Sequence, residues 1–465
     1  MISIADFLRF KFDKYKIKES VGMDFVKGTR NNTRQEIGEV LNNNLNNNNI
    51  SVHGTIHIIR DMGDFDFIVL RKKDGLVQCV YDKKNTNIDM SEISEGCCVV
   101  AEGKVVEEKR SPNGFEIELE SLKILSKPFE PMPININKRK MNTSLETKLS
   151  LRPITLRNIR ERAVFKLQEG VVRGFREALQ ADGFTEIRTP KITKAGAEGG
   201  SNIFKLDYFG KKAFLAQSPQ FYKQTLVGVF EKVFEVAPVF RAEKHNTTRH
   251  LNEYVSMDFE MGFIDGFEDI METETMVLKN IMKVLKKDYS KEIEILGVEL
   301  PEITEIPAVR FKEAKELVAA EYGRKIKDPY DLEPEEEQLI GKYFKEKYDS
   351  DFVFVTHYPS KKRPFYAMDD PQDTKYTLSF DLLFKGLEVT TGGQRIHDYQ
   401  QQVDKMIKKG LNPADFESYL MIHKYGMPPH GGLGIGLERL CMQLLGENNV
   451  RETSMFPRDM NRLEP

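Results

Sequence analysis

The sequence predicts an α+β protein with two domains, a small N-terminal β-barrel followed by a larger domain that mixes strands with helices. Residues 50–126 alternate polar and apolar side chains with a period of two, as half-buried strands do. Prolines at positions 128, 131, 133 and 153 then precede a long helical segment over residues 156–181. The chain has 465 residues, more than the roughly 250 to 300 that one hydrophobic core usually supports.

The composition is that of an ordinary globular protein, with 40% hydrophobic and 30% charged residues and a net charge of -3. This charge does not point to a nucleic-acid partner, but a local basic patch stays possible because phosphate binding depends on clusters of Lys and Arg. No apolar stretch approaches the roughly 18 residues that span a membrane. The N-terminal apolar run contains Asp6 and meets Arg9, so it is too short for a signal peptide.

The four cysteines show no CxxC spacing, and Cys97 and Cys98 are adjacent in an apolar run that is typical of a strand. This pattern argues against a zinc site and against a disulfide framework. We therefore expect a reducing, cytoplasmic setting.

Residues 1–49 are predicted to form an N-terminal extension. Residues 9–18 alternate basic and apolar side chains, which fits either an edge strand or frayed helix, or a basic arm that touches nucleic acid. Residues 42–49 are asparagine except for Leu45. Such a polar tract cannot bury a core and is expected to be a loop or tether.

Five short strands are expected over residues 50–60, 65–70, 75–81, 97–106 and 115–125. Turn sequences separate them at residues 62–64, 73–75 and 111–114, and a helix is expected near residues 88–93. This spacing fits a Greek-key barrel of the OB type, whose exposed sheet face commonly binds oligonucleotides. Spacing alone leaves a fragment of a β-sandwich as the alternative.

The expected domain boundaries place the barrel at residues 50–128, a hinge linker at 129–155 and the larger domain at 156–465. Its first helix, residues 156–181, is expected to end at Asp182 and Gly183. A segment near residues 285–350 is rich in Lys and Glu and is expected to be a helical, peripheral insertion. The sequence contains neither GxGxxG nor GxxxxGK[ST], so a nucleotide site would be neither of the Rossmann nor of the P-loop kind.

Three clusters in the larger domain could carry chemistry. Residues 240–250 place Arg241 and further charged residues at the end of an apolar strand, residues 386–395 place Glu388 and Arg395 in a glycine-containing strand, and residues 431–439 run through glycines to Arg439. Arginines together with an acidic residue that can hold Mg²⁺ are what phosphoryl chemistry on ATP needs. Taken singly, each cluster has a structural alternative, because arginines form ion pairs and glycine clusters are usually turns.

In this order, the clusters resemble the three signature motifs of the class II aminoacyl-tRNA synthetases. The first motif corresponds to the helix that ends near Gly183 and to the strand over residues 184–190, the second to residues 240–243 with the loop to Glu260, and the third to residues 436–439. The resemblance covers roughly residues 50–465. It implies an OB-fold anticodon-binding domain followed by a class II catalytic domain built on an antiparallel sheet, and a homodimer formed through the first motif.

Within the class, residues 217–224 (Gln-Ser-Pro-Gln-Phe-Tyr-Lys-Gln) resemble the aspartate-specific segment, whereas asparaginyl enzymes typically carry a Ser-Gly-Gln-Leu type of sequence. Residues 249–253 resemble a loop of the archaeal and eukaryotic aspartyl branch. The resemblance therefore implies an ATP-dependent aspartyl-tRNA synthetase. The alternatives are an asparaginyl enzyme, which Lys223 disfavours, and a catalytically dead RNA-binding paralogue, which the intact Arg241, Glu388, Arg395 and Arg439 disfavour.

The resemblance also implies which residues bind L-aspartate. Lys223 and Arg395 would hold the two ends of the substrate, with Arg395 forming a bidentate contact to the side-chain carboxylate. Gln220, and Glu198 in a loop that resembles the mobile loop of the family, would bind the α-ammonium group. The implied aspartate-binding residues are Glu198, Gln220, Lys223, Arg241, Thr391 and Arg395.

For ATP, the resemblance implies that Arg241 bridges the α-phosphate and the attacking carboxylate, Tyr254 stacks on adenine and Arg439 binds the γ-phosphate, with Arg241, Arg439 and Glu388 as the catalytic residues. Glu388, with Asp381 and Thr391, would hold Mg²⁺; family members usually have Ser in place of Thr391, and the hydroxyl is retained. The implied ATP-binding residues are Arg241, Glu243, Arg249, His250, Leu251, Tyr254, Glu388, Gly436, Glu438 and Arg439.

In the barrel, Phe67 and Gln78 match positions at which the family stacks on and hydrogen-bonds to anticodon bases, and Glu116 is a further candidate. His57 and Pro112 occupy positions where enzymes restricted to tRNA(Asp) tend to have Trp and Lys. This resembles the non-discriminating branch, which charges both tRNA(Asp) and tRNA(Asn). The alternatives are neutral drift at the two positions and a discriminating enzyme.

Overall fold

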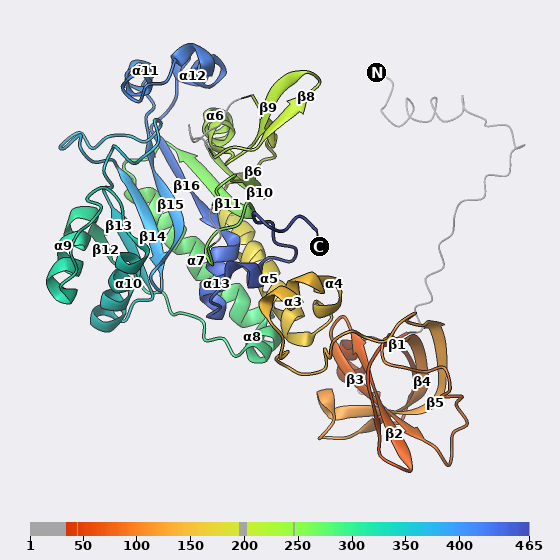
Figure 1. Ribbon diagram of the computed structural model, residues 1–465. Helices are drawn as coiled ribbons and strands as arrows, with labels where there is room; N and C mark the ends of the chain where they lie inside the picture. The colour runs from red at the N-terminus through yellow and green to blue at the C-terminus, as the bar shows by residue number, and fades with distance from the viewer. Residues whose placement is uncertain (1–33, 44, 195–201, 245–246, 465) are drawn as a thin grey trace, which may run out of the picture. The chain divides into compact units, whose positions relative to one another are not determined.

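The computed structural model describes residues 34–43, 45–194, 202–244 and 247–464 (Figure 1). The basic stretch at residues 9–18 and Glu198 lie outside these residues. The chain divides into two compact units, Met1–Asn135 and Ile136–Pro465. The linker that we expected over residues 129–155 is therefore shared between both units, and its second part contains the short helices α3 (Leu145–Ser150) and α4 (Arg152–Thr155).

The first unit contains the OB-type barrel, which confirms the barrel over the sandwich fragment. Its strands close in the order β1-β2-β3-β5-β4 around a core of aliphatic side chains such as Ile56, Ile68 and Leu70. The strands are β1 (Asn49–Asp61), β2 (Phe65–Lys72), β3 (Gly75–Asp82), β4 (Cys98–Glu107) and β5 (Phe115–Ser126). Helix α2 (Ile37–Asn42) precedes them, and the single turn η1 (Pro112–Gly114) leads into β5.

The helix expected near residues 88–93 is absent, and this prediction was wrong: the described chain there forms turns. In this stretch Asp89 Oδ1 accepts a hydrogen bond from the backbone N–H of Ser91 at 2.9 Å. Such local bonds compete with the helical ladder. Ile88 and nearby apolar residues still pack against the barrel core.

The asparagine tract is attached to the barrel and is not a free tether. Asn47 donates its backbone N–H to the carbonyl of Val105, and Val105 donates to Asn48, at 2.8 and 3.0 Å. Ile37 and Val40 of α2, just before the tract, are buried in the barrel core. The polar side chains remain at the surface while the backbone joins the sheet.

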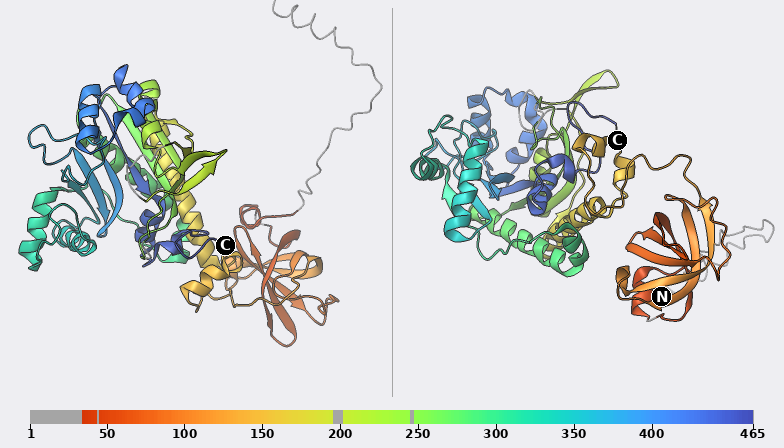
Figure 2. Two further views of the ribbon diagram at one scale, coloured as in Figure 1. Left: turned by 45° about the horizontal axis from the view of Figure 1, so that its top comes forward. Right: turned by 60° about the horizontal axis from the view of Figure 1, so that its bottom comes forward.

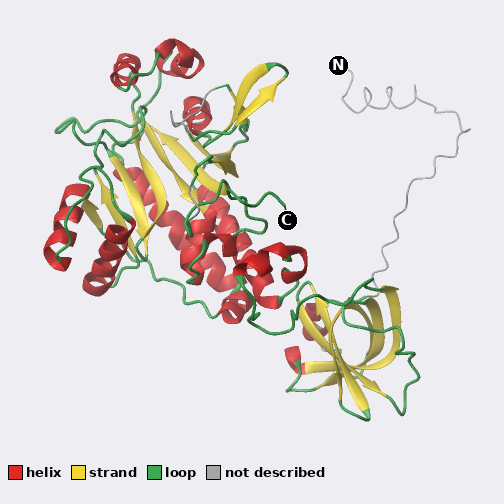
Figure 3. Ribbon diagram, in the orientation of Figure 1, coloured by secondary structure: helices red, strands yellow, loops and turns green. Residues whose placement is uncertain are grey.

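The second unit is built on an eight-stranded, largely antiparallel sheet in the order β12-β13-β14-β15-β16-β11-β10-β6 (Figures 1 and 3), which confirms the predicted α+β architecture. Its strands are β6 (Thr185–Glu186), β10 (Lys232–Phe240), β11 (Glu253–Gly262), β12 (Ala308–Arg310), β13 (Phe352–Thr356), β14 (Ser379–Phe384), β15 (Leu387–Arg395) and β16 (His430–Gly436). A separate three-stranded sheet contains β7 (Ile192–Thr193), β9 (Lys211–Leu215) and β8 (Lys205–Tyr208). Of the strand expected over residues 184–190, only β6 forms.

Helices α5 (Ile159–Ala181) and α7 (Glu268–Asp288) cover one face of the large sheet, and the main core lies between these helices and the sheet. Helices α9 (Phe311–Tyr322) and α10 (Pro334–Tyr348) pack against the opposite face of β13 and β14. The remaining helices are α6 (Gln220–Phe230), α8 (Ser290–Leu296), α11 (Tyr399–Lys408), α12 (Glu417–Lys424) and α13 (Leu437–Leu445), with the turns η2 (Pro413–Phe416) and η3 (Val450–Thr453). The predicted helix over residues 156–181 begins later, at Ile159, because the Asn158 side chain accepts hydrogen bonds from the N–H groups of Arg160 and Glu161 as an N-cap.

Period-two alternation in β11 separates the core from a polar face. Met257 and Phe259 point into the core, whereas Ser256, Asp258 and Glu260 point to the opposite face. In β15 a register shift breaks this rule: Leu382 pairs with Thr390 but Leu383 pairs with Glu388. The extra residue, a β-bulge, allows Glu388 and Thr391 to share a face although they are three residues apart.

The segment near residues 285–350 is only partly the helical insertion that we expected. It includes the end of α7, then α8, the edge strand β12 and the helices α9 and α10 (Figure 2). We use "α9–α10 insertion" for residues 311–348, which pack against the sheet through Val318, Ile340 and Phe344. Among the described residues, none of the helices combines the length and the apolar character that crossing a membrane requires.

Candidate active site

A cavity of about 440 Å³ opens on the polar face of the large sheet. β11, β15 and β16, helices α6 and α13, and the loops before β11 and β14 line it. Most of the residues predicted to bind aspartate or ATP meet here: Gln220, Lys223, Arg241, Glu243, Arg249, His250, Leu251, Tyr254, Glu388, Thr391, Arg395, Gly436, Glu438 and Arg439. Asp381 lines a neighbouring cavity of about 390 Å³ together with Glu388 and Arg439.

Glu260 connects the two cations that we expected to hold aspartate. Arg395 Nε donates to Glu260 Oε1 at 2.8 Å, and Lys223 Nζ lies 3.3 Å from Glu260 Oε2. Burial alone would raise the pKa of the fully buried Glu260 carboxyl, but the charges of Arg395 and Lys223 outweigh it and hold this pKa below its usual value. Glu260 thus stays ionised and holds both cations in place through ion pairs.

Two further contacts orient the cations. Lys223 Nζ bonds to Asp258 Oδ1 at 3.0 Å and to the carbonyl of Leu433 at 2.8 Å. Arg395 NH2 donates to the carbonyl of Gly432 at 2.7 Å. A Cβ at Gly432 would stand 2.3 Å from Glu260 Oε2, so only glycine leaves room for this carboxylate.

Buried amides lie beside these charges. Gln220, on α6, is 4% exposed, and its Nε2 has no hydrogen-bond partner among the described residues. Gln217 is equally buried, and its Oε1 lacks a partner in the same part of the chain. Since buried polar groups are usually satisfied, this end of the cavity is suited to a polar ligand that completes their hydrogen bonds.

Carboxylates and a hydroxyl form the second end of the cavity. Thr391 Oγ1 donates to Glu388 Oε1 at 2.9 Å, and Arg363 NH2 donates to Asp381 Oδ1 at 2.8 Å. Burial, opposed by Arg363 and reinforced by Glu388, raises the pKa of Asp381 to about 6. Burial would raise the pKa of Glu388, but the Arg439 charge, the Thr391 hydroxyl and the charges of Arg363 and Arg249 together hold it below its usual value.

This oxygen set fits a hard divalent cation. Mg²⁺ is usually held by one or two carboxylates together with substrate phosphates, and Asp381, Glu388 and Thr391 offer two carboxylates and a hydroxyl. The described residues contain no group of three or more His, Cys, Asp or Glu that could hold a metal by itself. An ion here would need oxygens from the substrate as well.

The two arginines near these carboxylates are held by backbone and side-chain contacts. Arg439 Nε donates to the carbonyl of Arg249 at 3.1 Å, and its NH1 donates to that of Glu388 at 3.3 Å. Arg249 NH2 bonds to Glu337 Oε2 at 2.6 Å. Burial, followed by the Glu388 charge, raises the pKa of Glu337 to about 7.

Arg241 reaches the cavity from the end of β10. Its backbone N–H bonds to the carbonyl of Asn252 at 2.9 Å, and its NH1 lies 4.0 Å from Glu243 Oε1. His250 Nε2 lies 3.9 Å from the other oxygen of Glu243. The ion pair that we considered as the structural alternative for Arg241 is therefore present but long, and about a third of the Arg241 side chain remains exposed to the cavity.

The wall of the cavity around Tyr254 and Leu251 is apolar. Tyr254 packs against the small cluster formed by Leu251, Leu387, Met442 and Val450. Beside it, both oxygens of Glu438 lie 3.1 Å from the backbone N–H of Val255, and burial raises the pKa of Glu438 to about 8. Glu438 thus joins helix α13 to β11 at the edge of the cavity.

Sequence reasoning missed several residues that line or support the cavity: Ser256, Asp258, Glu260, Lys362, Arg363 and Tyr366. Gln217 and Ser218 belong to the segment that resembles the aspartate-specific one, but they were given no role of their own. The alternation of polar and apolar residues over 253–262 was a readable signal for Ser256, Asp258 and Glu260. Lys362 and Arg363 come from a loop whose sequence carries no such signal.

In the barrel, the predicted anticodon residues lie on or next to one outer surface. Gln78 Nε2 donates to Ser111 Oγ at 2.9 Å and to Glu116 Oε2 at 3.1 Å, which places the turn that begins at Pro112 beside both. Phe67 shares the Gln78 face because Phe67 pairs with Val80, two residues beyond Gln78. Ser111 was not predicted.

His57 sits at an irregularity of β1. The register shifts between Ile56 and Ile58, so His57 is the extra residue of a bulge. Its Nδ1 lies 3.4 Å from Arg71 NH1, and the side chain is 4% exposed.

The comparisons with known proteins agree with this architecture. Residues 144–460 match the family model of the class II tRNA synthetases (D, K and N), and residues 50–125 match that of the OB-fold nucleic acid binding domain. Aspartate–tRNA(Asp/Asn) ligase of Deinococcus radiodurans is 47% identical over 90% of this chain and 95% of its own length. Aspartate–tRNA(Asp) ligase of Pyrococcus abyssi is 40% identical over 90% of this chain and 97% of its own.

Among solved structures, the asparaginyl-tRNA synthetase of Pyrococcus horikoshii, complexed with asparaginyl-adenylate, superposes with a TM-score of 0.85 at 30% identity, over 91% of this chain and 97% of its own. The identity to the two aspartate–tRNA ligases named above is higher and spans both units. The chain therefore belongs to the class II tRNA synthetases of the D, K and N group and, within that group, to the aspartate–tRNA ligase family.

Proposed function

We propose that the protein activates L-aspartate with ATP and transfers it to tRNA, and that it charges both tRNA(Asp) and tRNA(Asn). The observation that carries the proposal is the buried Lys223–Glu260–Arg395 cluster, whose two cations line the cavity. Two fixed cations suit a dicarboxylic amino acid. An asparagine side chain would direct amide donors at these donors, which leaves buried charges unpaired and is strongly disfavoured.

In the first step, the aspartate α-carboxylate would attack the α-phosphorus of ATP. A bond from the carboxylate oxygen to phosphorus forms, the bond to the bridging oxygen breaks, and pyrophosphate leaves with the electron pair. We assign to Arg241 the neutralisation of the charge that develops between the α-phosphate and the attacking oxygen. Arg439 would bind the γ-phosphate, and Tyr254 would stack on adenine against its apolar wall.

No side chain has to act as a nucleophile, because both reacting groups belong to the substrates. Placing them in line supplies most of the acceleration, as expected for a rigid, preorganised cavity. Asp381, Glu388 and Thr391 would hold Mg²⁺, which would supply positive charge to the phosphates of ATP. In the second step, a terminal ribose hydroxyl of the tRNA would attack the adenylate carbonyl carbon and displace AMP.

The choice of tRNA would be made in the barrel. The two anticodons differ only in their third base, and we assign its recognition to the positions of His57 and Pro112, where a Trp and a Lys would restrict it. The name of the Deinococcus radiodurans relative, which includes both tRNAs, supports charging of both. The four cysteines, all within the described residues, form no disulfide, which fits the reducing cytoplasm in which we propose that the protein acts.

We also propose that two copies of the chain form a homodimer through the second unit, which we call the catalytic unit (Ile136–Pro465). Val229, Phe230 and Phe263 are 65%, 47% and 69% exposed, and they gather where the N–H of Gly262 bonds to the carbonyl of Glu231 at 2.8 Å. This apolar patch adjoins β6 of the first motif, through the pairing of Val233 with Thr185. Contiguous exposed apolar residues of this kind mark association surfaces.

The proposed activity is tested by ATP–pyrophosphate exchange with single amino acids and by parallel charging of purified tRNA(Asp) and tRNA(Asn). Exchange that depends on aspartate supports the enzyme, and exchange that depends on asparagine would contradict it. If tRNA(Asn) is not charged, the proposal that the protein charges both tRNAs is wrong. The proposed activation of aspartate is not affected by that result.

Arg395→Lys should preserve the fold and lose most aspartate activation, because one ammonium cannot replace a two-point guanidinium contact. We expect a loss of about 2 to 4 kcal/mol in transition-state binding, or roughly 30- to 1,000-fold in kcat/KM for aspartate. Pyrophosphate exchange at varied aspartate measures this, with Tm and the KM for ATP as controls. Near-normal efficiency would contradict the role given to Arg395.

Glu388→Gln should weaken the use of MgATP much more than the binding of tRNA, because the barrel holds its own candidate anticodon residues. We expect roughly a tenfold rise in the Mg²⁺ concentration needed for half-maximal exchange, as one charged ligand is lost. Filter binding of tRNA is the internal control. Equal losses in both measurements would indicate misfolding and remove the support for this role.

His57→Trp combined with Pro112→Lys should depress charging of tRNA(Asn) and spare tRNA(Asp). Discrimination at a single base is worth about 1 to 3 kcal/mol, or roughly tenfold to a hundredfold in the ratio of efficiencies. His57 is buried, so each single variant and its Tm should be measured beside the double variant. Aspartate-dependent exchange should not change, and an unchanged tRNA ratio would refute the assignment.

Phe263→Asp should shift the protein from dimer to monomer, because it places a charge in the apolar patch. Phe263 has φ 57°, a left-handed conformation that Asp tolerates better than Phe, so the fold should be retained. We expect the dissociation constant of the dimer to rise by roughly 30-fold or more, as for a central interface residue. Light scattering over a concentration series measures it. Ile407→Asp, at a similarly exposed residue of α11, is the matched control.

A further inference from the structure

The α9–α10 insertion reaches the cavity through a carboxylate that no motif contains. Glu337, on the first turn of α10, is buried with 6% exposure. Its Oε2 accepts a bond from Arg249 NH2 at 2.6 Å and one from the backbone N–H of Glu388 at 3.3 Å. One side chain therefore touches two residues that line the end of the cavity with Asp381, Glu388 and Thr391, which we call the phosphate end because we propose that the phosphates of ATP bind there.

The approach of α10 to this site depends on two glycines. A Cβ at Gly341, one turn after Glu337, would stand 2.4 Å from the backbone nitrogen of Gly386. A Cβ at Gly386, which has φ +75°, would stand 2.7 Å from the Cα of Gln338. Only hydrogen side chains at both positions allow helix α10 to lie directly on the turn that leads into Glu388.

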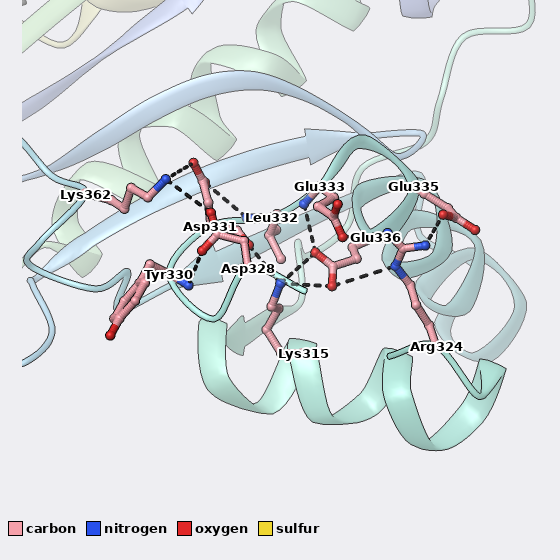
Figure 4. A network of polar contacts seen from close by, with 10 residues as sticks. All are labelled: Lys315, Arg324, Asp328, Tyr330, Asp331, Leu332, Glu333, Glu335, Glu336 and Lys362. Atoms are coloured by element: carbon pink, nitrogen blue, oxygen red, sulfur yellow. Dashed lines mark hydrogen bonds and ion pairs between the residues drawn. The ribbon is translucent and has the colours of Figure 1, made fainter. Parts of the chain in front are cut away.

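A polar network makes the insertion rigid (Figure 4). Lys315 of α9 donates to both oxygens of Glu336 at 2.9 and 2.7 Å, and Arg324 pairs with Glu333 at 2.7 Å. Lys315 and Glu336 are both almost fully buried. Because a broken buried pair is costly, this pair fixes the start of α10, and with it Glu337.

The same insertion contacts the cavity at a second place. Lys362, which lines the cavity, lies 3.3 Å from Asp328 and 3.5 Å from Asp331 in the loop between α9 and α10 (Figure 4). Asp331, Leu332, Pro334 and Glu337 also form one wall of the neighbouring cavity that contains Asp381 and Glu388. The insertion is thus part of the phosphate end and is not peripheral.

We propose that Glu337 is a positioning residue for ATP, which holds the Arg249 guanidinium at the phosphate end of the cavity and fixes the backbone of Glu388. It does not touch substrate itself and acts through these two residues. The inference rests on the proposed function in that ATP is the nucleotide bound. It assigns to the insertion a part in nucleotide binding, because Glu337 bonds to Arg249 and Glu388, whereas Lys223, Glu260 and Arg395 are held by one another, by Asp258 and by carbonyls of β16.

Glu337→Gln keeps the size of the side chain and removes its charge. We expect the KM for ATP in aspartate-dependent pyrophosphate exchange to rise about tenfold, the effect of one weakened charge-assisted bond. The KM for aspartate should stay within about twofold, since that end of the cavity is held by separate contacts. KM values do not depend on the amount of folded enzyme, so partial misfolding would not mimic this split.

Two comparisons complete the test. Glu346→Gln, on the same helix with a side chain that is 57% exposed and 3.8 Å from Lys342, should change neither KM. In an Arg249→Ala background, Glu337→Gln should add less than about twofold to the KM for ATP, because its main partner is already gone. A full additional effect in that background, or an equal rise in both KM values, would overturn the proposal. Absence of exchange in the wild type would instead overturn the proposed function.

Discussion

The buried charge of Glu260 is the constraint on which the rest of the catalytic unit depends. A fully buried carboxylate is tolerated only if cations and hydrogen bonds compensate it, and here Arg395 from β15 and Lys223 from α6 both do so. Each cation is bonded in turn to a carbonyl of β16. One charge therefore fixes three strands and a helix relative to one another, and the cavity takes its shape at the point where they meet.

The phosphate end obeys a different rule, in which charges of opposite sign alternate. Glu388 lies near Arg439, Asp381 bonds to Arg363, and Arg249 bonds to Glu337. Burial, reinforced by the neighbouring Glu388 charge, raises the pKa of both Asp381 and Glu337, although each of the two carboxylates is bonded to an arginine. A nucleotide bound together with a divalent cation adds negative and positive charges at once. It therefore suits a site in which each carboxylate already lies beside an arginine.

Much of the fold could be predicted because strand alternation and turn residues are local signals. The five barrel strands lie within two residues of their predicted ends, since each is bounded by a turn sequence. The helix predicted in the gap between strands near residues 88–93 does not form, and Asp89 there accepts a hydrogen bond from the backbone N–H of Ser91, a local bond that competes with a helix. The start of α5 was misplaced for a related reason: the cap at Asn158 depends on a side-chain hydrogen bond that spacing does not reveal.

The candidate site shows where prediction from motifs stops. Arg241, Glu388 and Arg439 could be named because each belongs to a run of residues whose order is itself distinctive. Glu337 could not, because it stands in a Glu-rich helix start where its neighbours Glu335 and Glu336 look the same, and only burial against Glu388 sets it apart. The position of Glu337 beside Glu388 depends on Gly341 and Gly386, which allow helix α10 to lie close to the turn that leads into β15. A residue that acts by positioning another is defined by packing across distant parts of the chain, and such packing leaves no local pattern in the sequence.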